Sequence, residues 1–240
     1  MSLRGREIVL AGGAGGLGSA TASLLLAEGA RVLISYRSNR ERAERAALEI
    51  RLPAGQVIQA DLASEKDRAR LLDEAPELYG LVVLTGDPAR GSDLAATLPR
   101  SFETNFAGPI QLAREAAERM KARGIPGSIV MLGTMQAGAL FPVSTAYASQ
   151  KAALLHASLI LAKECRGPAN IRVNVVNPGV TAAGMAQASI AAGKYQRYLD
   201  EGAIARYGAA IDVARAIRFF LEPDNYITGQ VLTVDGGLTL

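Results

Sequence analysis

EIVLAGGAGGLGSATASLLLAEG, residues 7–29, is the stretch that decides the fold of this 240-residue chain. It opens with an apolar run typical of a buried strand, passes through a cluster of glycines, and continues with the spacing of a helix. Glycines permit a sharp turn and close backbone approach to a pyrophosphate, and the following helix N-terminus offers free N–H groups and a positive dipole end. The strand–loop–helix order therefore predicts a dinucleotide-phosphate site. Its predicted residues are Gly12, Gly15, Gly16, Leu17 and Gly18.

The alternation of short apolar runs and helical segments continues to the end of the chain. The runs that predict strands are residues 7–11, 31–35, 56–60, 80–84, 128–132, 172–176 and 230–234. Segments with helical spacing, such as 19–29, 40–50 and 112–124, lie between them. Parallel strands need crossovers of this length, so we expect an α/β, single-domain Rossmann fold over residues 1–240, with a seven-stranded, mostly parallel, doubly wound sheet. Ligands bind such sheets beyond the carboxyl ends of the strands.

Composition and charge exclude several classes of function. Hydrophobic residues make up 49% and aromatics 5%, which suits buried parallel strands built from small aliphatic side chains. The net charge of +3 comes without basic blocks, so we expect no nucleic-acid partner. No uninterrupted apolar stretch reaches about 18 residues and no signal peptide precedes the first strand, so we expect no membrane partner and a cytoplasmic location. The single cysteine, Cys165, and the single histidine, His156, predict no metal site.

The end of the second predicted strand indicates which dinucleotide is bound. Sites that select NAD usually carry an acidic residue here for the ribose 2′-OH, whereas this chain has ISYRSNRER, residues 34–42, with no acid before Glu41. A guanidinium suits a 2′-phosphate through forked, charge-assisted hydrogen bonds. Arg37, with Ser38 or Arg40 beside it, is therefore placed to meet a 2′-phosphate. The cofactor residues predicted here are Tyr36, Arg37 and Ser38, and the predicted cofactor is NADP(H). Arg37 could also be an ordinary surface residue at the start of a charged helix.

A tyrosine and a lysine stand four residues apart in STAYASQKAAL, residues 144–154. Ser144 or Thr145 is a natural N-cap, so the helix should begin just before Tyr147. Positions i and i+4 share a helix face, which places the Lys151 ammonium beside the Tyr147 phenol. A nearby cation lowers the pKa of a phenol, so Tyr147 is expected to serve as an acid or base near neutral pH. An ordinary Tyr–Lys surface pair is the alternative.

Taken in order, several motifs resemble the short-chain dehydrogenase/reductase family over essentially the whole chain. They are GGAGGLG, Asp61-Leu62, Asn105, YASQK, NPGVT and ITGQVLTVDGG. The resemblance implies that the Thr134 hydroxyl bonds the substrate oxygen, that Lys151 also holds the nicotinamide ribose, and that Asn105 positions a water chain toward it. It further implies cofactor contacts at Asp61, Leu62, Gly86, Pro178, Gly179, Val180 and Thr181, a substrate lid over about 181–208, and a homotetramer.

Three positions depart from the pattern of the family that the chain resembles. Ala11 replaces a threonine that opens the glycine loop, Gly15 replaces a frequent basic residue, and Val83-Leu84-Thr85-Gly86 replaces N-N-A-G. In the family those asparagines stabilise the central sheet, and apolar residues cannot supply their hydrogen bonds.

The leading hypothesis is an NADPH-dependent carbonyl reductase with Tyr147 as general acid. Motif layout resembles 3-oxoacyl-acyl-carrier-protein reductases, so the expected substrate is a small-molecule or carrier-bound ketone such as a 3-oxoacyl thioester. Two alternatives remain: a dehydrogenase that oxidises a secondary alcohol, and a non-catalytic NADP-binding protein. Residues that could attract an acidic carrier, or be solvated helix ends, are Lys121, Arg123 and Arg166. Lid residues that could touch substrate are Met185, Ile190, Tyr195 and Tyr198.

Overall fold

The computed structural model describes residues 3–91 and 93–240 of the chain. In this part, seven parallel strands form one sheet in the order β3-β2-β1-β4-β5-β6-β7, which confirms the predicted Rossmann-like α/β fold. The strands are β1 (Glu7–Ala11), β2 (Arg31–Tyr36), β3 (Val57–Gln59), β4 (Leu78–Val83), β5 (Ser128–Leu132), β6 (Arg172–Pro178) and β7 (Val231–Val234). The order reverses between β1 and β4, and this switch point is where such sheets bind ligands.

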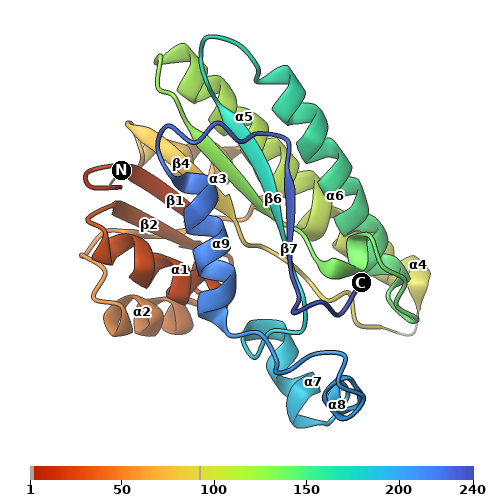
Figure 1. The fold of residues 1–240 in the computed structure, drawn as a ribbon. Coiled ribbons are helices and arrows are strands. Elements are labelled where there is room, and N and C mark those ends of the chain that lie inside the picture. The colour runs from red at the N-terminus through yellow and green to blue at the C-terminus, as the bar shows by residue number, and fades with distance from the viewer. Residues whose placement is uncertain (1–2, 92) are drawn as a thin grey trace.

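Helices cover both faces of the sheet (Figure 1). One layer holds α1 (Gly16–Ala27), α2 (Arg40–Glu49) and α9 (Ala210–Leu221). The other holds α3 (Glu65–Asp73), α5 (Gly108–Ala122) and α6 (Thr145–Glu164). α4 (Leu94–Phe102) leads through a π-helical turn, Glu103–Ala107, into α5. The short helices α7 (Gln187–Ala191) and α8 (Gln196–Asp200) extend beyond the carboxyl edge of the sheet.

Two apolar cores result from the alternation of side chains along the buried strands. On β1, Val9 and Ala11 face the layer of α3, α5 and α6, whereas Ile8 and Leu10 face the layer of α1 and α9. All four side chains are fully buried, and burying an aliphatic side chain of this size contributes roughly 1.5–3 kcal/mol. This double-sided packing fixes the carboxyl ends of the strands as a rigid edge.

Two strands, β1 and β5, have the predicted bounds, and the ends of the other five differ from the predicted ones by one or two residues. β4 begins at Leu78, two residues before its predicted start, and β6 continues to Pro178 because β7 pairs with it as far as that residue. β3 is shorter than predicted, since it is an edge strand that pairs with β2 alone. Among the described helices, none combines the length and apolar composition needed to cross a bilayer.

Candidate active site

Most of the predicted site residues follow a strand and therefore lie together at the carboxyl edge of the sheet. The glycine loop follows β1, Arg37 and Ser38 follow β2, Asp61 and Leu62 follow β3, Gly86 follows β4, Thr134 follows β5, and Gly179, Val180 and Thr181 follow β6. Tyr36 and Pro178 are the last residues of β2 and β6. Tyr147 and Lys151 reach the same edge from the first turns of α6, and Asn105 reaches it from the π-helical turn.

The glycine loop has the conformation that its sequence predicts. Gly12 adopts φ +80° and its N–H donates to Ser35 Oγ at 3.1 Å. A side chain on Gly18 would collide with the Gly13 carbonyl, so α1 can start this close beneath the loop only with glycine there. Gly15 is the N-cap of α1 and brings no side chain to the first-turn N–H groups. These groups remain free for an anion, as a pyrophosphate site requires.

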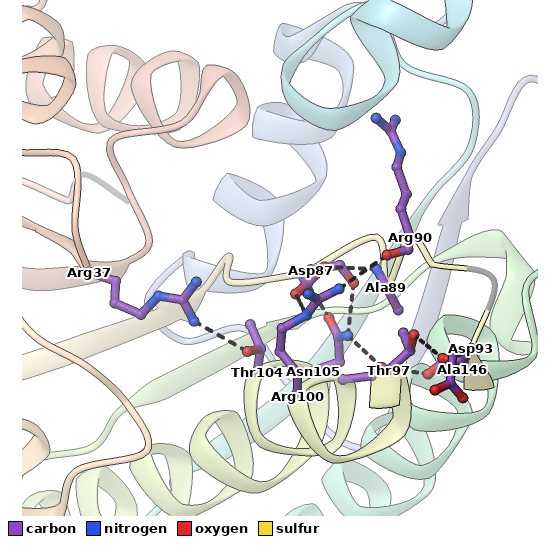
Figure 2. A network of polar contacts seen from close by, with 11 residues as sticks. Arg37, Asp87, Ala89, Arg90, Asp93, Thr97, Arg100, Thr104, Asn105 and Ala146 are labelled. Atoms are coloured by element: carbon purple, nitrogen blue, oxygen red, sulfur yellow. Dashed lines mark hydrogen bonds and ion pairs between the residues drawn. The ribbon is translucent and has the colours of Figure 1, made fainter. Parts of the chain in front are cut away.

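At the ribose end, Arg37 is exposed and its Nη1 donates to Thr104 Oγ1 at 3.4 Å (Figure 2). It therefore extends across the carboxyl edge of the sheet toward the π-helical turn. Ser38 is exposed, and Asn39 rather than Ser38 caps α2, because Asn39 Oδ1 accepts the Arg42 N–H at 2.9 Å.

Arg42 is a residue at this end that the sequence argument missed. Its Nη2 lies 3.9 Å from the position that a Cβ on Gly15 would occupy, so the guanidinium stands beside the glycine loop. Neither spacing nor composition identifies it, since the orientation of α2 against the loop brings it there.

Asp61 and Leu62 shape the end of β3. The Asp61 carboxylate accepts the Ala63 N–H at 3.1 Å, and the Leu62 carbonyl accepts a hydrogen bond from Arg68 Nη1 at 2.8 Å. Leu62 is buried where a Cβ on Gly108 would come within 2.9 Å of its backbone, so glycine at the start of α5 permits this close packing.

Thr134 is the hydroxyl residue that the structure pairs with Tyr147. It is buried, its hydroxyl is near enough to the phenol to lower the pKa of Tyr147, and its N–H donates to Asn177 Oδ1 at 3.1 Å. The expected capping role of Ser144 is wrong in one respect. Ser144 does occupy the N-cap of α6, but its hydroxyl donates to Gln136 Oε1, and it is its backbone carbonyl that accepts the Ala148 N–H.

The expected effect of Lys151 on the phenol is also wrong for this structure. Burial raises the pKa of Tyr147 to about 12; the nearby Thr134 hydroxyl lowers it in part, and the neighbouring Tyr195 raises it slightly. Burial likewise lowers the pKa of Lys151 to about 7. Desolvation, which a helical spacing cannot reveal, dominates both shifts, and Lys151 is not among the groups that shift the pKa of the phenol. Tyr147 is therefore a protonated phenol across the physiological pH range.

Lys151 is 1% exposed and its ammonium is held by two strand ends. Nζ donates to Leu132 O at 2.8 Å and to Thr85 O at 3.1 Å. A Cβ on Gly86 would lie 3.9 Å from Lys151 Cε and 3.4 Å from Met185 Cε of the lid. The loop after β4, the lysine and the lid thus converge at one place.

Asn105 clamps the loop after β4 (Figure 2). Its Oδ1 accepts the Asp87 N–H at 2.9 Å and its Nδ2 donates to Asp87 O at 2.9 Å and to Ser101 Oγ at 3.0 Å. The Asp87 carboxylate pairs with Arg100 at 2.7 Å. This fully buried amide supplies hydrogen bonds to the loop in a chain whose residues 83 and 84 are apolar. Thr85 Oγ1, by contrast, is buried without a hydrogen-bond partner in the described part of the chain.

The lid begins directly over the glycine loop. A Cβ on Gly16 would lie 3.2 Å from the Gly184 nitrogen and 3.3 Å from Ala183 Cβ. The Thr181 hydroxyl donates to Gly179 O at 3.2 Å, so it serves the turn itself. Arg90 tethers the lid, since its Nη2 lies 3.4 Å from both Met185 O and Ser189 Oγ.

Further along the lid, Tyr195 and Tyr198 stack with ring centroids 6.4 Å apart. Since Tyr195 raises the pKa of Tyr147, this aromatic pair stands close to the phenol.

The arrangement fits a bound dinucleotide. A glycine loop in which Gly13 and Gly18 have no room for a side chain forms the phosphate cradle, and two arginines flank the ribose end. A buried lysine and a protonated tyrosine lie at the opposite end of the same edge. Glycine cradle, ribose contact and proton donor therefore occupy one continuous edge at the switch point of the sheet.

Comparison with known proteins supports the same interpretation. Residues 12–239 match a family model described as enoyl-(acyl carrier protein) reductase. The chain is 30% identical over 263 residues to NADPH-dependent aldehyde reductase 2, chloroplastic, of Arabidopsis thaliana, covering 100% of this chain and 96% of that protein. It is 30% identical to L-xylulose reductase of Homo sapiens, covering 98% of this chain and 97% of the relative. A solved short-chain type dehydrogenase/reductase from Mycobacterium ulcerans superposes with TM-score 0.89 at 28% identity, covering 100% and 91%.

Proposed function

The chain belongs to the short-chain dehydrogenase/reductase family of oxidoreductases, and we propose that it reduces a ketone or aldehyde to the alcohol with NADPH. The observation that carries the proposal is the placement of Tyr147, one helical turn from the buried Lys151 and close to the buried Thr134, at the carboxyl edge of the sheet. A phenol that stays protonated is in the state that a general acid in a carbonyl reduction requires.

When bound, the dinucleotide supplies the hydride that adds to the carbonyl carbon. Tyr147 donates its proton to the carbonyl oxygen as negative charge develops there, and then regains a proton from solvent. The Thr134 hydroxyl orients the same oxygen, and its position is fixed because its own N–H is held by Asn177. Lys151 holds the ribose next to the reacting ring with the ammonium that now rests on two carbonyls. The protein's contribution is therefore positioning and proton supply.

The choice of NADPH rests on charge at the ribose end. Arg37 lies just after β2, where an acidic residue would favour NAD, and the Arabidopsis relative is named for NADPH dependence. We further propose a cytoplasmic location, where NADPH is kept reduced and a lone cysteine is not oxidised to a disulfide.

We propose a small-molecule carbonyl or a free 3-oxoacyl thioester as substrate rather than a carrier-bound one. Lys121 and Arg123 end α5, and Arg166 follows α6. These helices run antiparallel to the strands, so all three cations lie at the amino edge of the sheet, at the end opposite Tyr147 (Figure 1). A carrier docked there would be on the wrong side of the molecule.

The test is NADPH oxidation with a panel of aldehydes, pentuloses and 3-oxoacyl thioesters, beside titration of NADPH binding. Wild type should turn over at least one class of carbonyl, Tyr147→Phe should lose at least about 100-fold in kcat with NADPH affinity unchanged, and Thr134→Ala should lose less. Tyr226→Phe, at a fully exposed tyrosine, is the matched control. NADPH binding without turnover of any carbonyl would instead identify a non-catalytic NADP-binding protein.

A further inference from the structure

Arg42 occupies the space beside the glycine loop that a side chain at position 15 would enter. Its Nη2 lies 3.9 Å from a Cβ placed on Gly15, and the other atom near that position is the Gly12 carbonyl oxygen at 3.8 Å. The arginine belongs to the first turn of α2, where its own N–H donates to the Asn39 cap at 2.9 Å. The backbone that carries it is therefore fixed in direction.

The charge of this guanidinium is not neutralised by the protein. Among the described residues, the Arg42 side chain has neither a hydrogen bond nor an ion pair, whereas Arg40 in the same turn pairs with Glu44 at 2.7 Å. Arg37 makes a single 3.4 Å contact with the Thr104 hydroxyl. Two cations thus approach the ribose end from different elements. Arg37 comes from the end of β2, and Arg42 comes from α2, with its guanidinium beside the glycine loop.

Resting on the proposed use of NADPH, we propose that Arg42 binds the 2′-phosphate of the adenosine ribose and, with Arg37, selects NADP(H) over NAD(H). An arginine can place two N–H donors on one phosphate, and charge-assisted bonds of this kind are about twice as strong as neutral ones. Arg42, from α2, thereby supplies the positive charge to the 2′-phosphate that Gly15, which has no side chain, cannot supply.

The primary experiment titrates the cofactor-free protein with 2′,5′-ADP and with 5′-AMP. Wild type should bind 2′,5′-ADP more tightly, and Arg42→Gln should lose about 10- to 100-fold of that affinity while 5′-AMP binding stays within about twofold. Arg45→Gln is the matched control, because Arg45 is exposed on the next turn of α2 and its loss changes the net charge equally.

A second variant tests whether a cation beside the glycine loop is what binds the 2′-phosphate, rather than the net charge of the protein. Gly15 has φ −89° and ψ 171°, an extended conformation open to any residue, and its Cβ position meets ordinary contacts. Gly15→Lys in the Arg42→Gln background should therefore restore most of the 2′,5′-ADP affinity, and the ratio of kcat/KM for NADPH and NADH should follow the same order.

The outcomes separate this inference from the function on which it rests. If Arg42→Gln binds 2′,5′-ADP as wild type does while Arg37→Asp reverses the cofactor ratio, the role of Arg42 is refuted and the use of NADPH stands. If wild type does not distinguish 2′,5′-ADP from 5′-AMP, the proposed use of NADPH fails, and the role of Arg42 fails with it.

Discussion

Lys151 is buried, and the loss of hydration destabilises its charged form. The free energy of unfolding therefore depends on pH at this residue. Its pKa is lowered from 10.5 to about 7 by burial. Between these two values the unfolded chain binds a proton at this residue that the folded chain has released. The contribution of Lys151 to the free energy of unfolding therefore rises as the pH increases from about 7 to 10.5, and it is constant below about pH 7. Tyr147, whose pKa rises from 10.0 to about 12, affects stability only above about pH 10.

We predict that wild type gains stability relative to Lys151→Met as the pH rises from 6.5 to 9.5, by about 2 kcal/mol or more. Urea unfolding of the cofactor-free proteins at several pH values measures the difference. Lys163→Met, on an exposed position of the same helix, should run parallel to wild type. If the unfolding free energies of wild type and Lys151→Met changed in parallel with pH, the pKa of Lys151 would not be lowered by burial.

At the residue scale the sequence predicts where the candidate side chains lie but not their electrostatic state. Tyr147 and Lys151 lie one turn apart on α6, as their spacing predicts, and the roles assigned to them and to Thr134 stay predictions. The pKa directions could not be predicted, because they depend on the ends of β4 and β5 that close over the lysine. Arg42 escaped notice for a related reason, since only the packing of α2 turns it toward Gly15.

Among the elements, the π-helical turn Glu103–Ala107 determines the shape of the loop after β4. One amide, on Asn105, satisfies both the N–H and the carbonyl of Asp87. Irregular turns of this kind are frequent at functional sites, and no periodicity in the sequence predicts one. The apolar Val83 and Leu84 cannot supply the side-chain hydrogen bonds expected after β4. Asn105, from the π-helical turn, supplies hydrogen bonds to the backbone of Asp87 in that loop instead.

We predict that Asn105→Ala lowers the unfolding free energy by about 1–3 kcal/mol, because it leaves two partly buried backbone groups of Asp87 without the Asn105 amide. It should also speed hydrogen exchange at the Asp87 amide and raise the KM for NADPH. Thr104→Ala, in the same turn, is the control, since its side chain makes only a 3.4 Å contact with Arg37. Unchanged exchange at Asp87 in Asn105→Ala would show that the loop is held by other contacts.

On the scale of the whole molecule, the periodicity of the sequence predicts the fold, but it does not predict the conformation of residues 181–208, the lid that the family resemblance implies. Strands and crossovers alternate clearly because each strand is buried on both faces, so its apolar run stands out from the helices around it. Residues 181–208 lack such a period. Their position is set by distant contacts, of Ala183 and Gly184 with Gly16 and of Arg90 with Ser189.

The edge of the sheet at β7 exposes apolar side chains. Val231 and Leu232 are each 38% exposed, and Phe219 of the adjacent α9 is 42% exposed. Parallel sheets are normally covered on both faces, and exposed apolar edge strands tend to pair with other chains. We therefore expect a second copy of this chain to cover β7 and α9 across a twofold axis, within the proposed homotetramer.

Leu232→Glu should place a charge in that interface and shift the sedimentation coefficient from that of the expected tetramer to that of a smaller species. Far-UV circular dichroism should stay unchanged, since the side chain lies outside both cores. Leu48→Glu is the matched control, because Leu48 is 79% exposed on α2 and far from this edge in Figure 1. A wild-type protein that sediments as a single chain over the micromolar range would refute the interface. In that case the apolar side chains of β7 would need another partner.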